Sequence, residues 1–303
     1  MKRKRPSPPQ TWAQTKPGHE KPAARHVPTG GKPVGGKPVG SKPGHAPHGR
    51  QQGAPRRGGG GDPARFLWGV HAVRAALANP ARRCRRLLVT TQGRESVADI
   101  LPATLAVEIL DRQALDALLP DAVHQGVALE TEPLAEPDLE DVLESVPAAA
   151  PLLLVVLDQV TDPHNVGAIL RSAAAFGAAA LIVQDRHSPP VSGTLAKAAS
   201  GGIEIVPIVR VTNLARALDR LRDSGLFCLG FDSEAECDLH AIEPGTRVAL
   251  VMGAEGPGLR RLTRERCDMM AKLPTQDPVA SLNVSNAAAI ALYDMARRLI
   301  KAA

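Results

Sequence analysis

The chain has 303 residues, of which 37 are Lys or Arg and 31 are Asp or Glu, so its formal net charge is +6. That charge is confined to one end: residues 1–62 hold thirteen basic and two acidic residues, a net of +11, whereas the rest holds 24 basic and 29 acidic residues, a net of −5. The slightly acidic body excludes a globule coated with phosphate-binding cations.

The cysteines and the apolar segments indicate the compartment. The four cysteines have no metal-ligand spacing, which indicates buried, reduced thiols and no metal site. No apolar segment reaches the roughly 18 residues that span a bilayer, and the first residues, MKRKRPSPPQ, lack the apolar core of a signal peptide. We therefore expect a cytoplasmic protein without a membrane segment.

Residues 1–62 predict a disordered basic tail. They contain eleven Pro and thirteen Gly with few large apolar side chains, too few to offset the entropy of an ordered chain. Two hypotheses fit this tail. It either holds the phosphates of a polyanion by counterion release or only keeps the protein soluble.

Residues 63–132 predict a small α/β domain, and residues 133–150 an acidic linker that contains a turn or two of helix. The periodicity predicts helices over 69–78, 98–101 and 111–118 and strands over 86–91, 107–110 and 127–130. Four arginines, at positions 82, 83, 85 and 86, form a dense cationic cluster. This cluster either contacts a polyanion or simply faces water.

Residues 151–303 predict a larger α/β domain. The run 152–157 is apolar without alternation, which is typical of a parallel strand buried on both faces. Further strands are expected over 181–184, 203–206, 226–231 and 247–252, and helices over 166–176, 192–199, 214–223 and 284–301. This alternation favours a mostly parallel sheet with helices on both faces.

Polar residues follow the strand 152–157, where ligands of open α/β sheets bind. Asn165 is expected in the turn and Arg171 within the helix. A spacing of six puts two side chains on different faces of a helix, so both can share a site only if Asn165 belongs to the turn. Alternatively, Asn165 caps the helix and Arg171 is a solvated charge.

Three motifs occur in a fixed order: N-V-G-A-I-x-R-S-A at 165–173, M-G-x-E-G-x-G at 252–258 and S-L-N-V-S at 281–285. Together they resemble the SpoU (TrmH-like) branch of the SPOUT methyltransferases, which methylate ribose 2′-hydroxyls in RNA. The resemblance extends from residue 152 to the C-terminus. W-G-x-H-A-V at 68–73 and V-H-Q-G-V at 123–127 resemble the RNA substrate-binding domain that precedes many such catalytic domains.

The resemblance implies a trefoil-knotted catalytic domain, S-adenosylmethionine as the cofactor, and a homodimer to which the last helix contributes. It implies that the cofactor contacts Gly253, Leu273 and Leu282. The implied catalytic and substrate-holding residues are Asn165, Arg171, Glu255, Ser281 and Asn283. Since a guanidinium is no ordinary base, we interpret Arg171 as a clamp on the target phosphate and developing alkoxide.

Plainer interpretations of the same residues stay open. Glu255 either orients Asn165 or Arg171 or is a turn carboxylate satisfied by backbone N–H groups. Ser281 and Asn283 could simply cap the last helix.

The small domain favours 23S rRNA guanosine as the target within the family. The alternatives are a tRNA guanosine methyltransferase, a resistance-type enzyme acting on an rRNA adenosine, and a catalytically silent RNA-binding assembly factor. Retention of the whole set of polar residues weighs against a silent protein.

Overall fold

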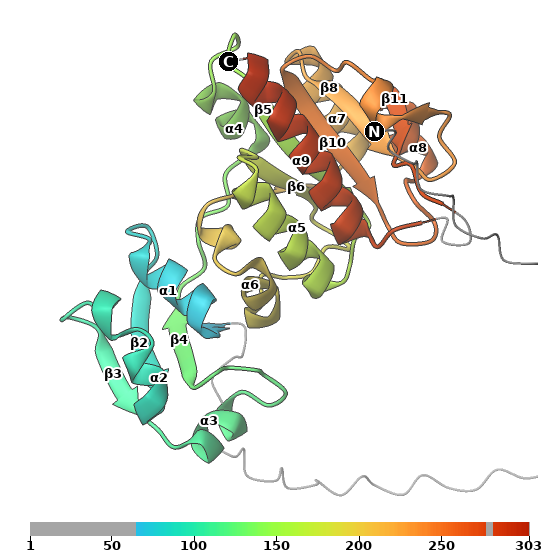
Figure 1. Cartoon of the computed structure of the whole chain (residues 1–303). Coiled ribbons are helices and arrows are strands. Elements are labelled where there is room, and N and C mark those ends of the chain that lie inside the picture. The colour runs from blue at the N-terminus through green and yellow to red at the C-terminus, as the bar shows by residue number, and fades with distance from the viewer. Residues whose placement is uncertain (1–64, 277–280, 303) are drawn as a thin grey trace, which may run out of the picture. The chain divides into compact units, whose positions relative to one another are not determined.

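The structure is a computed structural model that describes residues 65–276 and 281–302. The predicted basic tail, residues 1–62, lies outside the described residues. From Arg65 onward the chain forms a four-stranded and a seven-stranded sheet (Figure 1). No helix within the described ranges is long and apolar enough to cross a bilayer.

The four-stranded sheet is mixed and has the order β1-β4-β2-β3. Only β2 and β3 pair in parallel. Its strands are β1 (Phe66–Trp68), β2 (Cys84–Val89), β3 (Ala106–Ile109) and β4 (Val127–Thr131), and its helices are α1 (Val70–Ala78), α2 (Thr91–Glu95) and α3 (Arg112–Leu118). These elements match the predicted small α/β fold, although the sequence predicts neither β1 nor α2.

The seven-stranded sheet is parallel throughout, in the order β7-β6-β5-β10-β8-β11-β9. Its strands are β5 (Leu152–Asp158), β6 (Ala180–Gln184), β7 (Ile208–Val211), β8 (Phe227–Phe231), β9 (Cys237–Asp238), β10 (Arg247–Gly253) and β11 (Met269–Lys272). The helices are α4 (Leu139–Ser145), α5 (Pro163–Ala175), α6 (Gly193–Ala199), α7 (Leu214–Asp223), α8 (Arg261–Glu265) and α9 (Val284–Ala302). This confirms the predicted α/β class with a parallel sheet.

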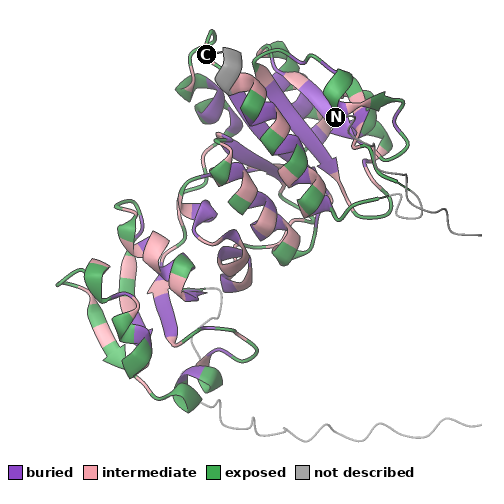
Figure 2. Ribbon diagram, in the orientation of Figure 1, coloured by how far each residue is buried: buried purple, intermediate pink, exposed green. Residues whose placement is uncertain are grey.

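The sheet is the middle layer of three. Alternate residues of β5 join two different core clusters, one with α5, α6 and α9 and the other with α4 and α7. All seven residues of β5 are buried, and Figure 2 shows β5 and β10 as buried strands under the helices. The unbroken apolar run of the sequence thus has its expected cause, a central strand covered on both faces. The trefoil knot stays a prediction.

One strand predicted for this domain and the prediction that the cysteines are buried are wrong. Residues 203–206 are not a strand, because Gly202–Glu204 form a 3-10 helix and β7 begins after Pro207. Ile205 is accordingly 71% exposed. The cysteines are not all buried either, since Cys237 is exposed.

The start of α5 also differs from the prediction. Asp162 is the N-cap, its carboxylate accepts a hydrogen bond from the N–H of His164 (2.9 Å), and Pro163 is the first helical residue. Asn165 therefore belongs to the first turn of the helix, not to the preceding turn, and it is not the cap. Since Asn165 and Arg171 share one regular helix, their side chains leave it in different directions.

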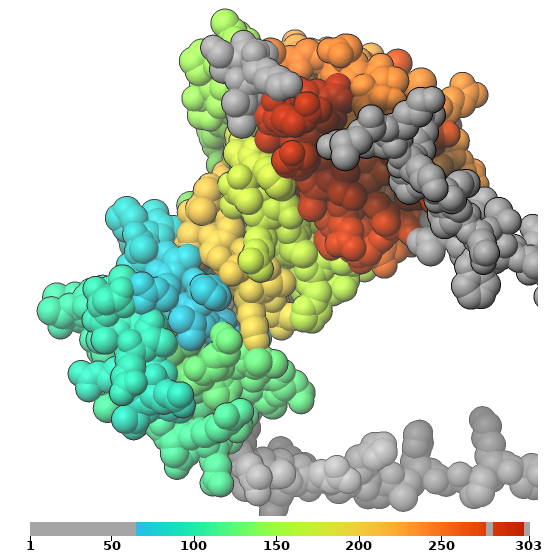
Figure 3. All heavy atoms as spheres, in the orientation of Figure 1, coloured from blue at the N-terminus to red at the C-terminus, as the bar shows by residue number. Residues whose placement is uncertain are grey.

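The last helix, α9, packs beside α5, and Figure 3 shows the two helices next to each other. Two large apolar residues of this helix, Ile290 and Tyr293, are 46% and 56% exposed. The Tyr293 ring meets Phe176, just after α5, edge to face with centroids 5.8 Å apart. Helices α5 and α9 thus present a partly apolar outer face.

Candidate active site

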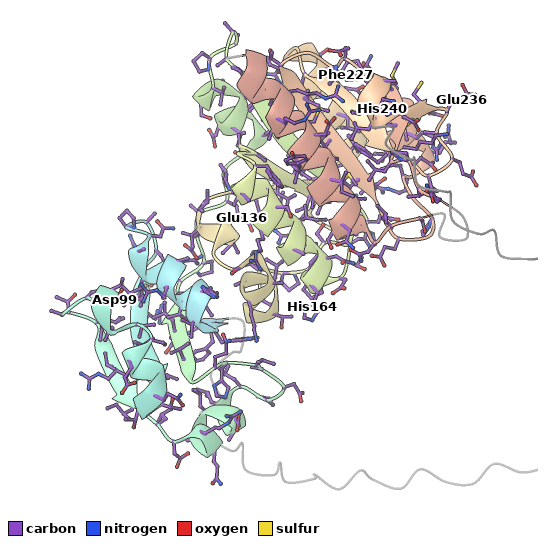
Figure 4. The ribbon with its side chains drawn as sticks, viewed as in Figure 1. Asp99, Glu136, His164, Phe227, Glu236 and His240 are labelled. Carbon is purple, nitrogen blue, oxygen red and sulfur yellow. The ribbon has the colours of Figure 1, made fainter. Side chains whose placement is uncertain are left out.

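The site lies at the carboxyl ends of β5 and β10, which are neighbours in the sheet. Their register places Asp158, the last residue of β5, opposite Gly253, the last residue of β10. Because both strands run in parallel, the segments that follow them begin at the same edge. Helix α5 begins five residues after β5, and Figure 4 labels His164 at its amino-terminal end.

Three polar side chains from three motifs form one hydrogen-bonded network. The Glu255 carboxylate oxygen Oε1 accepts from Asn165 Nδ2 at 3.0 Å and from Asn283 Nδ2. Asn283 Nδ2 also lies 3.0 Å from Asn165 Oδ1, and the N–H of Val284 donates to Glu255 Oε1 at 3.4 Å. Segments up to 118 positions apart are thereby joined through one carboxylate oxygen.

The hydrogen bonds of this network bear on two open questions: whether Glu255 orients another side chain or only satisfies backbone N–H groups, and whether Asn283 only caps the last helix. Glu255 contacts Asn165 and not Arg171, and among its donors in the described part of the chain one, the N–H of Val284, is a backbone group. Asn283 does both things expected of it: its Oδ1 accepts from the N–H of Ser285 at 2.9 Å, as a helix cap does, while its Nδ2 belongs to the network.

A cavity of about 620 Å³ lies beside this network. The described residues that line it include Gly253, Leu273 and Leu282, together with Glu255, Ser281 and Asn283. One wall is the loop 254–258, which Ala254 and Gly258 close through reciprocal backbone hydrogen bonds of 3.2 and 3.0 Å. Two glycines in this loop have positive φ, 83° at Gly256 and 67° at Gly258, so the tight turn requires them.

Gly253 has a different reason to be glycine. A Cβ at this position would lie 2.3 Å from the carbonyl carbon of Gly258 and 2.5 Å from the nitrogen of Leu259. The space that a side chain would fill is therefore occupied by the loop's own backbone.

Arg171 stands apart from the network. It is exposed, and no carboxylate or carbonyl among residues 65–276 and 281–302 bonds to its guanidinium. Six residues of helix also place it about 9 Å along the axis from Asn165. The structure thus brings Asn165, Glu255 and Asn283 together and leaves Arg171 free to meet an anion.

The predicted cationic cluster is largely neutralised. Arg82 is buried and pairs with Glu204 at 2.6 Å, and Arg85 pairs with Glu132 at 3.1 Å. Arg83 lies 3.7 Å from Glu132, and Arg86 pairs with Glu130 (2.7 Å) and Glu108 (3.1 Å). Only Arg82 is thereby committed to a buried structural pair, whereas the side chains of Arg83, Arg85 and Arg86 stay 84%, 51% and 43% exposed in weak surface pairs.

The sequence prediction missed one polar cluster next to the site. Asp158 is fully buried, with Oδ2 accepting from the N–H of Arg260 (2.9 Å) and Oδ1 from its Nε (2.7 Å). The same guanidinium donates to Gln184 Oε1 at 2.8 Å. The sequence did contain a signal for this cluster: Asp158 directly follows an unbroken apolar run. A carboxylate buried at that position needs a charged or hydrogen-bonding partner.

Comparison with known proteins places this geometry in a family. Residues 152–293 match the SpoU rRNA Methylase family, and residues 66–137 match the RNA 2′-O ribose methyltransferase substrate binding family. The chain is 42% identical over 242 residues to the 23S rRNA (guanosine-2′-O-)-methyltransferase RlmB of Vibrio vulnificus, covering 77% of this chain and 96% of that protein. The chain belongs to the SpoU rRNA methylase family.

Further comparisons also find SpoU methyltransferases. The chain is 41% identical over 243 residues to RlmB of Escherichia coli, covering 77% of this chain and 98% of that protein. Among solved structures, the SpoU methyltransferase AviRb from Streptomyces viridochromogenes, in complex with AdoMet, has a TM-score of 0.64 at 26% identity. That match covers 78% of this chain and 90% of AviRb.

Proposed function

We propose that this protein transfers a methyl group from S-adenosylmethionine to the ribose 2′-hydroxyl of a guanosine in 23S rRNA, in the cytoplasm. The observation that carries the proposal is the network of Asn165, Glu255 and Asn283 at the wall of the cavity. The RlmB relatives, matched over nearly their whole length, supply the nucleotide and the RNA.

The cavity suits the cofactor in size and lining. A volume of about 620 Å³ falls within the range of pockets that hold drug-sized ligands. Loop 254–258 offers backbone groups at close range because its glycines lack side chains. When bound, the cofactor supplies an electrophilic methyl group on a sulfonium. Gly253 would hold it through the loop, and Leu273 and Leu282 through main-chain groups and apolar contact.

The polar network would hold and orient the target ribose. Glu255 fixes both amides, so that Asn165 and Asn283 present their groups with little loss of side-chain entropy on binding. Ser281 lies on the same cavity wall and adds a hydroxyl that can donate or accept. We assign Arg171 to the target phosphate and the developing alkoxide, because its guanidinium is exposed and without a carboxylate partner in the described chain.

The position of Arg171 favours a homodimer. Within one chain Arg171 points away from Asn165, yet it is exposed on α5, the helix that packs beside α9, and α9 carries the exposed apolar residues Ile290 and Tyr293. We propose that two copies pair through α5 and α9 and that Arg171 serves the site of the other copy. Residues 63–132 would contribute RNA binding, and residues 151–303 the chemistry.

Methyl transfer to purified RNA tests the proposal. Full-length protein, labelled S-adenosylmethionine and unmethylated 23S rRNA should give one 2′-O-methylguanosine, located by mapping the labelled nucleotide. Asn165→Ala should abolish the signal. Labelling of tRNA but not 23S rRNA would move the assignment to the tRNA alternative, and no labelling despite cofactor binding would indicate a silent RNA-binding factor.

A further inference from the structure

The loop that carries Glu255 is fixed at its base by a residue pair outside the three motifs. The loop leaves the sheet at Gly253 and ends at Arg260, which returns to Asp158, the register neighbour of Gly253. Both oxygens of the Asp158 carboxylate are used by this single residue, one by its backbone N–H and one by its Nε. The carboxylate is fully buried, and among the residues that the structure describes Arg260 supplies both of its hydrogen bonds, which compensate the buried charge.

The same loop is held at a second point. Glu255, two residues after Gly253, accepts from Asn165, Asn283 and Val284. A six-residue loop pinned at its end and near its start has few other conformations, particularly since Ala254 and Gly258 are also bonded to each other. Where Arg260 is held therefore decides where the Glu255 carboxylate and the cavity wall 254–258 lie.

We propose that Asp158 and Arg260 are positioning residues for methyl transfer, which keep loop 254–259 closed so that Glu255 and the cofactor cavity are preformed. This inference rests on the proposed function. Gln184, at the end of β6, accepts a hydrogen bond from Nη2 of the Arg260 guanidinium at 2.8 Å and so restricts it to this geometry. The three residues together tie the carboxyl ends of β5 and β6 to the end of the loop that follows β10.

The competing explanation is that the pair only stabilises the fold, and the chain offers a matched control. Asp268 makes the same two kinds of bond: it accepts from Arg222 Nε at 2.9 Å and from the backbone N–H of Cys228 at 2.8 Å. It does so at the amino end of β8, where Figure 4 labels Phe227 far from His164. The Asp158 side chain is 0% exposed and that of Asp268 24% exposed, so a purely structural role for Asp158 predicts that Asp158→Asn lowers the melting temperature more than Asp268→Asn does, while both leave cofactor binding and turnover unchanged.

The experiment compares these variants in the full-length protein by calorimetry with S-adenosylmethionine, by hydrogen exchange and by methylation of 23S rRNA. In Asp158→Asn one of the two carboxylate oxygens becomes an NH2 group, so the side chain can no longer accept from both the backbone N–H and the Nε of Arg260. We expect cofactor Kd to rise and kcat to fall, each by about tenfold or more, because a shift of about 1 Å can reduce a rate about a hundredfold. Amide exchange should accelerate in residues 254–259.

Asp268→Asn should lower the melting temperature but leave cofactor Kd, kcat and exchange of the loop unchanged. If Asp158→Asn does not fold, Arg260→Gln provides the same test, because Arg260 is partly exposed and its backbone N–H still bonds to Asp158. Arg260→Lys should recover little, since one ammonium cannot reach both Asp158 and Gln184.

A coupling measurement completes the test. Combining Asp158→Asn with Glu255→Gln should weaken cofactor binding by less than the product of the two single effects, whereas Asp268→Asn with Glu255→Gln should be additive. Equal Kd, kcat and loop exchange in Asp158→Asn and the wild type would overturn the inference, as would additive coupling. Wild-type protein that binds no S-adenosylmethionine would instead refute the proposed function.

Discussion

Replacing Gly253 with alanine is expected to weaken cofactor binding by displacing a loop and not by filling the pocket. The new Cβ would lie 2.3 Å from the Gly258 carbonyl carbon, whereas carbon atoms in contact are about 3.5 Å apart. The backbone at Gly258 would therefore have to retreat by about 1.2 Å. The bonds between Ala254 and Gly258, now 3.2 and 3.0 Å, would lengthen or break.

The size of the effect follows from this collision. Overpacking of this kind costs about 1–3 kcal/mol. If the cost falls on the closed loop that the cofactor needs, Kd for S-adenosylmethionine should rise by about 5- to 150-fold. Calorimetry on the full-length protein measures this directly.

The control is Gly245→Ala, which places a Cβ at φ 79° with no atom within 4 Å and lies outside the cavity lining. It should cost about 1–2 kcal/mol of stability through backbone strain without changing cofactor Kd. The valine variant separates the two explanations. If Gly253→Ala binds the cofactor normally and only Gly253→Val fails, then the side chain fills ligand space and the loop argument is wrong.

Three further predictions concern other parts of the chain. A 1:1 mixture of Arg171→Ala and Asn165→Ala subunits should recover roughly a quarter of wild-type methylation after the subunits exchange. Half of the dimers are then mixed, and each mixed dimer has one complete site out of two. No recovery would place Arg171 in the site of its own chain. Deleting residues 1–62 should weaken RNA binding and flatten its salt dependence while cofactor Kd stays constant, whereas an unchanged salt slope would leave the tail as a solubiliser. Burial raises the pKa of Cys228 and of Cys267 to about 12, so in the folded protein both thiols should resist alkylation at pH 9 while exposed Cys237 reacts. Since unfolded thiols ionise near pH 8.5, the free energy of unfolding should fall as pH rises from about 9 to 12, which chemical denaturation at several pH values measures.

The sequence predicted the secondary structure correctly where a local pattern had a single physical cause. The apolar run 152–157 predicted a central strand because only burial on both faces tolerates it, and β5 is that strand. The helix after it was predicted to begin too late. Asp162 followed by Pro163 already carried the signal of an N-cap and a first helical proline, which puts Asn165 inside the helix.

Pairings between distant residues could not be predicted from local patterns. The run 203–206 has the apolar composition of a strand, but Pro207 follows it and the strand starts only beyond that proline. The arginines at 82–86 look like a nucleic-acid surface until their partners are known, and Glu204 lies 122 positions away from Arg82. Asp158 and Arg260 are 102 positions apart, and no periodicity in either segment points to the other.

Parallel pairing of β5 with β10 explains why the site and its support occur at one place. The register sets Asp158 beside Gly253, so a carboxylate that ends one strand is adjacent to the residue at which the other strand turns into the cavity wall. From that edge, α5 carries Asn165 inward to Glu255, while the same helix carries Arg171 outward, where a second copy or an RNA phosphate can reach it. A change at the β5–β10 edge should therefore alter cofactor binding first, whereas a change on the outer face of α5 should alter only the step that needs RNA.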